Sequence, residues 1–288
     1  MRRASGVMGG GRARRPVLWA GSALAGPALA VLVLSPAGHG AARFAARLAA
    51  AAATLSTQAP QARQAQASGH LFEGVPEVGA LFQVSNGGLG RHFCTAAVVD
   101  SPVKDLVITA AHCVSGQRPG QIAFVPAYRN GSHPYGVWIV RRIIVDADWQ
   151  QNQDPNRDVA FLVVGHAGQA GVQHVTGGVR LGTGWPRRTW VHVIGYPDGG
   201  QWPLICANRT RPFGPHQLRF DCGGYVDGTS GGPFLARWDA AAGTGTVIGV
   251  IGGYEQGGYL AAVSYSSRFG HAIRALYRTA VADARAAG

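Results

Sequence analysis

Charged residues are scarce in this chain and unevenly distributed. They make up 14% of the 288 residues, and residues 1–68 contain eight arginines but no acidic residue. The formal net charge of +12 comes mainly from this leader, because the remaining 220 residues balance 18 basic against 14 acidic side chains. The sequence also lacks a basic stripe, an RRM-like aromatic pattern and zinc-finger spacing, so its charge gives no indication of nucleic-acid binding.

Metal-binding spacings are absent as well. The chain has four cysteines without a paired CxxC spacing, ten scattered histidines and no HExxH motif. These absences disfavour a metal site. In an exported protein, four cysteines indicate two disulfides, for which the count alone allows three pairings.

The N-terminal segment has the three parts of a secretory signal in the required order. Arginines through Arg15 precede an uncharged run from Val17 to Leu34, and small residues follow from Ser35 to Ala42. Glycines and a proline interrupt the run, so we interpret residues 1–40 as a cleaved signal peptide rather than a retained anchor. The Arg14–Arg15 pair is compatible with twin-arginine export and equally with an ordinary signal.

The rest of the chain divides into a short linker and a β-rich domain. Residues 41–70 are rich in Ala and Gln and are interpreted as a propeptide or linker. From residue 71 to 268, runs of Val, Ile, Phe and Trp alternate with Gly, Pro, Asn and Asp. This pattern predicts an all-β domain of about twelve short strands, either a sandwich or a pair of barrels. Apolar residues at helical spacing predict a C-terminal helix over residues 269–286.

Three short stretches contain residues suited to acyl transfer. LVITAAHCV places His112 after an apolar strand, NRDVAFLVV places Asp158 before another, and DGTSGGPF surrounds Ser230 with glycines. A serine nucleophile needs a base that takes its proton and an anion that orients this base. Each residue alone is explained as readily by a core histidine, a turn aspartate or a turn serine, so the hypothesis depends on all three together.

TAAHC, DVAFL and DGTSGGP, in this order, resemble the signature stretches of the chymotrypsin-like serine peptidases, which have the trypsin fold. The three stretches most resemble those of the secreted bacterial branch that includes glutamyl endopeptidases. The resemblance implies a peptidase domain over residues 71–288, with two six-stranded antiparallel β-barrels over roughly 71–175 and 176–268 and the active site between them.

The same resemblance implies a role for individual residues. His112 is expected to be the general base, Asp158 its orienting partner and Ser230 the nucleophile, with the N–H groups of Gly228 and Ser230 forming the oxyanion hole. It also implies the disulfides Cys94–Cys113 and Cys206–Cys222.

Two positions depart from the best-known members of the family. Animal digestive enzymes carry an aspartate before the serine, which pairs with a newly cut N-terminal amine; this chain has Thr229, so activation is expected not to use that pair. The specificity pocket is assigned to Gly224, Val250, Ile251 and Gly252.

Substrate preference follows from what this pocket lacks. Gly224 lies near the position where trypsins hold an acidic residue, which disfavours Arg or Lys substrates unless Asp221 or Asp227 enters the pocket. Glutamyl endopeptidases usually carry a histidine in the wall strand, where this chain has Val250 and Ile251. The expected preference is therefore for an uncharged, small or apolar side chain.

Two other functions remain open at this point. The segment Gly228–Gly232 also matches GxSxG, the nucleophile elbow of α/β-hydrolases, with Asp239 and His271 following in that fold's order. The elbow must lead into a helix, and Gly-Gly-Pro after the serine disfavours this interpretation. The second alternative is a catalytically inactive secreted homologue that acts as a binding protein.

Taken together, the sequence predicts a secreted, extracellular serine endopeptidase that hydrolyses peptide bonds through an acyl-enzyme. We expect a polypeptide substrate and no cofactor. We also expect a monomer that binds neither nucleic acid nor, once the leader is removed, a membrane.

Overall fold

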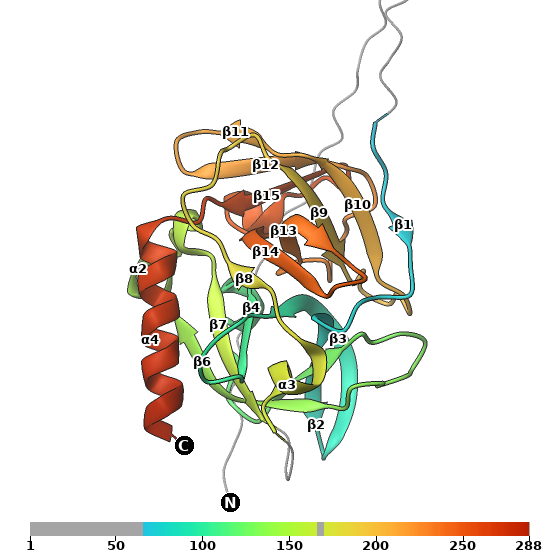
Figure 1. Ribbon diagram of the computed structural model, residues 1–288, viewed down its shortest axis with the longest axis vertical. Coiled ribbons are helices and arrows are strands. Elements are labelled where there is room, and N and C mark those ends of the chain that lie inside the picture. Colours follow the sequence, from blue (N-terminus) through green and yellow to red (C-terminus); the bar gives the residue numbers. More distant parts are fainter. Residues whose placement is uncertain (1–65, 166–169, 288) are drawn as a thin grey trace, which may run out of the picture. The chain divides into compact units, whose positions relative to one another are not determined.

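The computed structural model describes residues 66–165 and 170–287 of the chain (Figure 1). The predicted signal peptide, residues 1–40, and nearly all of the predicted propeptide or linker lie outside the described residues. The described chain forms two groups of strands, each with its own apolar core, which lie one above the other in Figure 1.

Six antiparallel strands close the first barrel, in the order β2-β3-β4-β7-β6-β5. Runs of Val, Ile, Leu and Phe form these strands because branched and aromatic side chains pack well on a half-buried pleated surface. Leu81, Phe124, Trp138 and Leu162 are fully buried in its core. The elements are β2 (Val78–Ser85), β3 (Gly88–Val98), β4 (Leu106–Thr109), η1 (His112–Val114), β5 (Ile122–Pro126), β6 (Trp138–Val145), α2 (Ala147–Asn152), η2 (Pro155–Arg157) and β7 (Ala160–Gly165).

The second half contains a six-stranded sheet, β1-β10-β9-β13-β14-β8, and a three-stranded sheet, β11-β12-β15. Residues from both sheets share one core, in which the rings of Phe220 and Phe234 lie 5.5 Å apart. The elements are β1 (His70–Leu71), α3 (Val172–Thr176), β8 (Arg180–Leu181), β9 (Trp190–Gly195), β10 (Leu204–Arg209), β11 (Arg211–Phe213), β12 (Gln217–Asp221), β13 (Pro233–Asp239), β14 (Thr244–Val250), η3 (Tyr254–Gly257) and β15 (Val263–Ser267).

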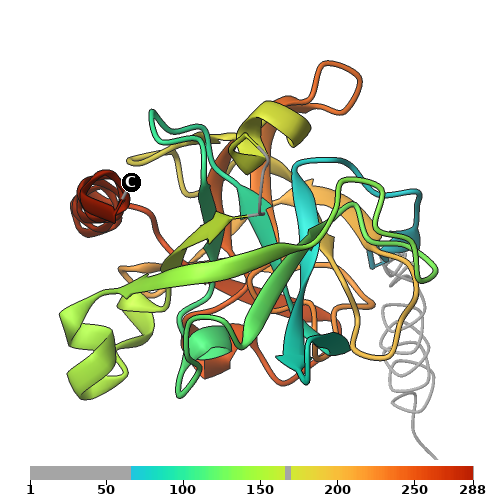
Figure 2. The same cartoon turned by 90° about the horizontal axis from the view of Figure 1, so that it is seen from below.

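The C-terminal helix α4 (His271–Ala287) follows the second half in sequence but covers the first barrel. It is seen end-on beside the strands in Figure 2. Ile273, Leu276 and Ala280 are buried in the cluster that also holds Val163 of β7. The ring of Tyr277 lies 5.7 Å from that of Phe161. The helix therefore ties the chain's last residues to the barrel formed by its first strands.

The folded domain takes in residues 66–70, which the sequence assigned to the linker. Strand β1 pairs with β10, Ser68 forms a bridge with Gly223, and the Gln66 side chain donates a hydrogen bond to the Ala262 carbonyl at 3.0 Å. No helix among the described residues has the length and apolar character needed to cross a bilayer.

Candidate active site

A cleft of about 810 Å³ is lined by residues from both halves of the domain. His112 and Cys113 come from the first barrel, whereas Gly228, Ser230 and Ile251 come from the second. His112 follows β4 by three residues, and Ser230 precedes β13 by three. The ends of two strands in different barrels thus bring together residues that are far apart in sequence.

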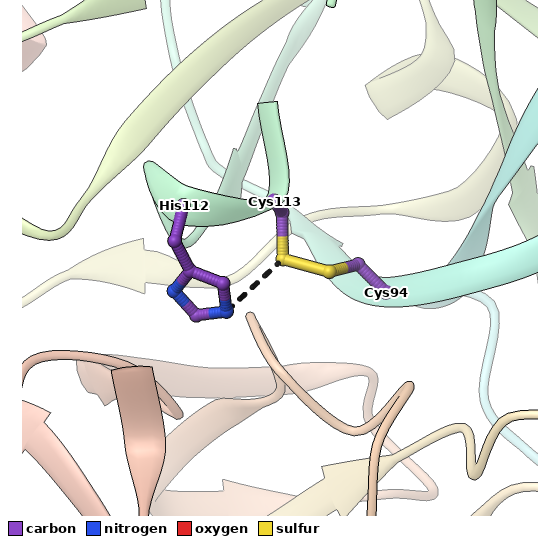
Figure 3. A group of neighbouring side chains, drawn as sticks. All are labelled: Cys94, His112 and Cys113. Carbon is purple, nitrogen blue, oxygen red and sulfur yellow. Dashed lines mark hydrogen bonds between the residues drawn. A yellow bond between two sulfur atoms is a disulfide. The ribbon is translucent and has the colours of Figure 1, made fainter. Parts of the chain in front are cut away.

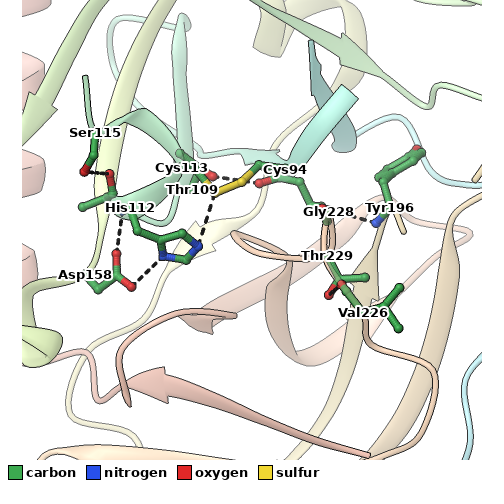
Figure 4. Close-up of a disulfide and its surroundings, with 12 residues drawn as sticks. Cys94, Thr109, His112, Cys113, Ser115, Asp158, Tyr196, Val226, Gly228 and Thr229 are labelled. Carbon is green, nitrogen blue, oxygen red and sulfur yellow. Dashed lines mark hydrogen bonds and ion pairs between the residues drawn. A yellow bond between two sulfur atoms is a disulfide. The ribbon is translucent and has the colours of Figure 1, made fainter. Parts of the chain in front are cut away.

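The carboxylate of Asp158 holds His112 through two hydrogen bonds (Figure 4). Its Oδ1 accepts the His112 backbone N–H at 2.8 Å, and its Oδ2 lies 2.8 Å from His112 Nδ1. The same Oδ2 accepts the Gly253 N–H at 2.8 Å. The Asp158 side chain is 0% exposed. A buried carboxylate is stable only with such partners, and these three also fix the plane of the imidazole.

This arrangement selects one tautomer of His112. A carboxylate can only accept, so Nδ1 must carry the proton that points at Asp158. In the neutral ring, Nε2 then has its lone pair free, and the disulfide sulfur of Cys113 lies 3.8 Å from it (Figure 3). The His112 side chain lines the cleft and is 12% exposed. The ring is therefore prepared to accept a proton there.

Ser230 lies in the loop between β12 and β13 and is half-buried. In the part of the chain that the structure describes, its hydroxyl and its N–H make no hydrogen bond, and neither does the Gly228 N–H. These groups face no internal partner in a loop that lines the cleft. They are therefore available to a bound molecule.

The orientation of the two N–H groups is set by the carbonyls on the other side of each peptide plane. In a planar trans peptide the C=O and N–H point in opposite directions. The Asp227 carbonyl, which shares a peptide with the Gly228 N–H, accepts the Asp198 N–H at 2.7 Å. The Thr229 carbonyl, which shares one with the Ser230 N–H, accepts the Gly232 N–H at 2.9 Å. Both donors are thus held facing away from these anchored oxygens.

The glycines of this loop are required by close contacts. Gly228 has φ +88°, and a Cβ there would lie 2.3 Å from the Asp198 nitrogen. A Cβ on Gly231 would lie 2.1 Å from the Thr95 carbonyl oxygen, and one on Gly232 would lie 2.3 Å from the Ile194 oxygen. No side chain fits at these distances, so the loop can reach its position only with glycine.

Thr229 is enclosed beside the serine. Its exposure is 2%, and its hydroxyl donates to the Val226 carbonyl at 2.7 Å. Its methyl group fills the space over Gly195, where an added Cβ would lie 2.9 Å from it. The side chain thus makes a local, uncharged contact at the position where the digestive enzymes are expected to hold an ion pair.

The four residues assigned to the specificity pocket are placed differently. Ile251 lines the cleft, and its backbone exchanges hydrogen bonds with Gly231 and Gly232 at 2.7 and 2.9 Å. Val250 is fully buried in the core and does not line the cleft. Gly224 and Gly252 lie beside the cleft but outside its lining; a Cβ on Gly252 would be 3.0 Å from Asp158 Oδ2.

Among the described residues, those that line the cleft include the carboxylates Asp198, Asp227 and Glu255 and no Lys or Arg. Arg91, outside this lining, forms an ion pair with Asp198 at 2.7 Å. Tyr225 also lines it, with its hydroxyl bonded to the Val193 carbonyl at 2.6 Å, and burial raises the pKa of this phenol so that it stays neutral.

Both disulfides join the cysteines that the resemblance paired. Cys94 and Cys113 are bonded between β3 and η1, and Cys206 and Cys222 between β10 and the end of β12. Cys94, His112 and Cys113 are the one group of three metal-ligating residue types found close together in the described residues. Because both sulfurs are used in the disulfide, they are not thiolates and cannot bind a metal (Figure 3).

Sequence reasoning missed the residues that hold the site through the backbone. The N–H groups of Gly253 and Asp198 bond to Asp158 and Asp227, and Thr95 contacts the serine loop from β3. Backbone donors have no signal in a sequence, because every residue except proline carries one. A threonine in a β-strand is equally ordinary.

Comparison with known proteins identifies the domain. A family model described as a trypsin-like peptidase domain matches residues 94–250. Among curated proteins, none matches the sequence.

Solved structures show the same fold. The protease Anisep from Arthrobacter nicotinovorans is 25% identical with a TM-score of 0.63, over 74% of this chain and 99% of that one. The thermostable serine protease AL20 from an extremophilic microorganism is 28% identical with a TM-score of 0.61, over 72% and 97%. A Glu endopeptidase at 13% identity and a TM-score of 0.58, over 76% and 98%, is similar in fold alone.

These matches confirm the predicted chymotrypsin-like double barrel with a C-terminal helix and rule out the α/β-hydrolase interpretation of Gly228–Gly232. With more than half of its length matched by the family model, the chain belongs to the trypsin-like peptidases, hydrolases that cut polypeptides with a serine nucleophile.

Proposed function

We propose that the protein is a secreted serine endopeptidase in which His112, Asp158 and Ser230 form the catalytic triad. The observation that carries this proposal is the pair of hydrogen bonds that His112 donates to Asp158, in a cleft that His112 and Ser230 both line. It supplies the base, its fixed tautomer and the nucleophile that acyl transfer needs.

The reaction follows from these positions. Ser230 Oγ attacks the carbonyl carbon of the scissile bond, and His112 Nε2 accepts the hydroxyl proton while Asp158 stabilises the imidazolium. The carbonyl oxygen becomes an anion, which the N–H groups of Gly228 and Ser230 stabilise. His112 then returns the proton to the leaving amine, and the acyl-enzyme on Ser230 is released by a water molecule activated in the same way.

An uncharged side chain is the proposed occupant of the specificity pocket. Ile251 and Val226 are apolar, and Tyr225 has its hydroxyl engaged with the Val193 carbonyl. The carboxylates of Asp227 and Glu255 repel an acidic side chain from the cleft, whereas that of Asp198 is paired with Arg91. Cleavage-site profiling on a peptide library checks this, and a preference for glutamate would contradict it.

Export is proposed from the leader and the disulfides. Residues 1–40 have the composition of a signal peptide, and all four cysteines are paired in the described domain. Disulfides persist in oxidising compartments outside the cytosol. We further propose that the mature enzyme acts as a monomer on polypeptides.

Labelling with a fluorophosphonate probe tests the triad. The probe phosphonylates an activated serine, so leader-free wild type is expected to be labelled, and Ser230→Ala and His112→Ala are not. Labelling that persists in Ser230→Ala contradicts the nucleophile assignment. A folded wild type that is neither labelled nor able to cleave any library peptide supports the inactive binding protein instead.

A further inference from the structure

Four consecutive peptide planes, from Asp227–Gly228 to Ser230–Gly231, contain or directly follow the two N–H groups of the proposed oxyanion hole. Two of them are held by backbone donors, Asp198 N–H on the Asp227 carbonyl and Gly232 N–H on the Thr229 carbonyl. The other two are the peptides that follow Gly228 and Ser230. Both must be fixed as well, because rotation about the bonds of Gly228, which has φ +88° and no side chain, would turn its N–H away from the cleft.

Thr95 binds the carbonyl of each of these remaining planes, whose N–H groups donate to the Val226 and Ile251 carbonyls at 3.1 and 2.7 Å. Its hydroxyl donates to the Gly228 carbonyl at 3.0 Å, and its N–H donates to the Ser230 carbonyl at 2.7 Å. The hydroxyl oxygen also accepts the Tyr196 N–H at 2.8 Å. A hydroxyl has one proton to donate, so the first of these bonds uses the only proton this side chain has.

The position of Thr95 is itself fixed. It is fully buried in β3, directly after Cys94 of the disulfide, and its carbonyl accepts the Thr109 hydroxyl at 2.8 Å. The residue therefore belongs to the rigid wall of the first barrel, although the loop it holds belongs to the second.

We propose that Thr95 is a positioning residue for the oxyanion hole: its hydroxyl holds the Gly228 carbonyl, and so the peptide that follows Gly228, which fixes the backbone angles of Gly228 and keeps the Gly228 N–H facing the substrate carbonyl. This inference rests on the proposed function. Thr95 acts on the loop from the first barrel without a charge, next to an uncharged Thr229. The digestive enzymes are expected to use an ion pair at the serine loop, and in this chain the buried Thr95 hydroxyl contacts that loop instead.

Thr95→Val tests this proposal because it removes the hydroxyl and keeps the shape of the side chain. With the Gly228 peptide released, we expect kcat on a peptide amide to fall about 10- to 100-fold. KM is expected to stay within about twofold, because the interaction strengthens only in the transition state. Thr95→Ser keeps the hydroxyl and is expected to restore kcat to within about threefold of wild type.

A peptide boronate provides a second measurement. Ser230 Oγ bonds to its boron, the hydroxyl proton passes to His112, and the resulting boronate oxygen occupies the oxyanion hole. Thr95→Val is expected to weaken boronate binding by about the same factor as kcat. Binding of the same peptide with a C-terminal amide in place of the boronic acid, which places no anion there, is expected to be unchanged.

Thr210→Val is the matched control. Thr210 is also fully buried, and its hydroxyl likewise accepts one backbone N–H, from Thr189 at 3.0 Å, and directs its proton at the Arg187 carbonyl at 3.0 Å, with the Thr189 carbonyl at 3.3 Å. It lies outside the cleft lining, so its loss is expected to lower stability without changing kcat.

The outcomes separate this inference from the proposed function. A wild type that is neither labelled nor active contradicts the proposed function. An active wild type together with unchanged kcat and boronate affinity in Thr95→Val contradicts only the proposed role of Thr95. An equal loss of kcat in Thr210→Val would also overturn that role, because general destabilisation would explain both. Thr95→Ala serves as the same test if Thr95→Val does not fold.

Discussion

The proposed base, His112, and the loop of the proposed nucleophile, Ser230, are held in place by different means. On the first barrel, His112 is fixed by the side chain of Asp158 and by the adjacent Cys94–Cys113 disulfide. On the second, the loop around Ser230 is fixed through its backbone carbonyls, by donors from β3 and from the turn at Asp198. Side chains of recognisable type thus determine one half of the site, and peptide orientation determines the other.

The largest effect on kcat is expected from replacing the Asp158 carboxylate that holds His112. In Asp158→Asn, the amide NH2 takes the place of Oδ2, where it faces His112 Nδ1 and the Gly253 N–H, or of Oδ1, where it faces the His112 backbone N–H. In the first orientation the imidazole loses the tautomer that leaves Nε2 free, and in the second the loop of His112 loses its backbone hydrogen bond. We expect kcat to fall by about 10⁴-fold. Steady-state kinetics and a nitrogen NMR spectrum of the imidazole check this. Activity within tenfold of wild type would show that Asp158 does not orient the base.

The next largest effect on kcat is expected from a substitution in the loop around Ser230, which is held through its backbone. In Gly228→Ala, the methyl group meets the Asp198 nitrogen and the Tyr196 oxygen, and the loop must move. We expect kcat to fall about 10²- to 10³-fold, with a loss of about 1–3 kcal/mol in the free energy of unfolding. Kinetics combined with urea unfolding measure both.

Gly214→Ala is the control for Gly228→Ala. Gly214 has φ +54° in the β11–β12 turn, and an added Cβ there contacts nothing within 4 Å. Its backbone strain is comparable, so only a small loss of stability and no loss of kcat are expected. A similar loss of kcat in both variants would show that the Gly228 contact has no special role.

Removing each disulfide in turn compares the two halves of the domain directly. Removing Cys94–Cys113 or Cys206–Cys222, by replacing both cysteines with alanine, opens loops of similar length, with separations of 19 and 16 residues. Each removal is expected to lower the free energy of unfolding by about 3 kcal/mol. The first also frees the loop of His112, so it alone is expected to lower kcat per active site. Denaturant unfolding and active-site titration give both numbers, and an equal kcat effect would contradict the assignment.

The smallest effect concerns Glu77, just before β2. It is 1% exposed, neither carboxylate oxygen has a hydrogen-bond partner in the described structure, and burial raises the pKa of this carboxyl from 4.5. The folded state then binds the proton more tightly than the unfolded state. Unfolding free energy is therefore expected to fall as pH rises above 4.5 and through the folded pKa, by at most about 1.4 kcal/mol per pH unit.

Urea unfolding of Glu77→Gln across this pH range tests the assignment. The variant is expected to lose this pH-dependent slope, whereas Glu73→Gln, at an exposed carboxylate, keeps it. A slope unchanged in Glu77→Gln would assign the pH dependence to another group.

Much of the fold could be predicted from the sequence. Alternating apolar residues and turn residues act locally, so strands such as β4 and β7 and the helix α4 are recognisable without tertiary information. The sequence did not reveal that residues 66–70 pair with the second half, because a short polar segment has no periodicity. Nor did it show that Val250, the last residue of β14, is buried away from the cleft while the next residue, Ile251, is buried but lines it, since the path of the chain after β14 decides this.

The amino-acid sequence by itself determined the fold class, the disulfide-forming cysteines and the residue types proposed for catalysis, because these depend on local patterns and on side-chain chemistry. Only the tertiary structure decided which way the Gly228 and Ser230 peptides face. Their orientation depends on Thr95, 133 residues before Gly228, and on backbone donors at Asp198 and Gly232. A peptide plane around glycine has little preference of its own, so its partners in space must set it.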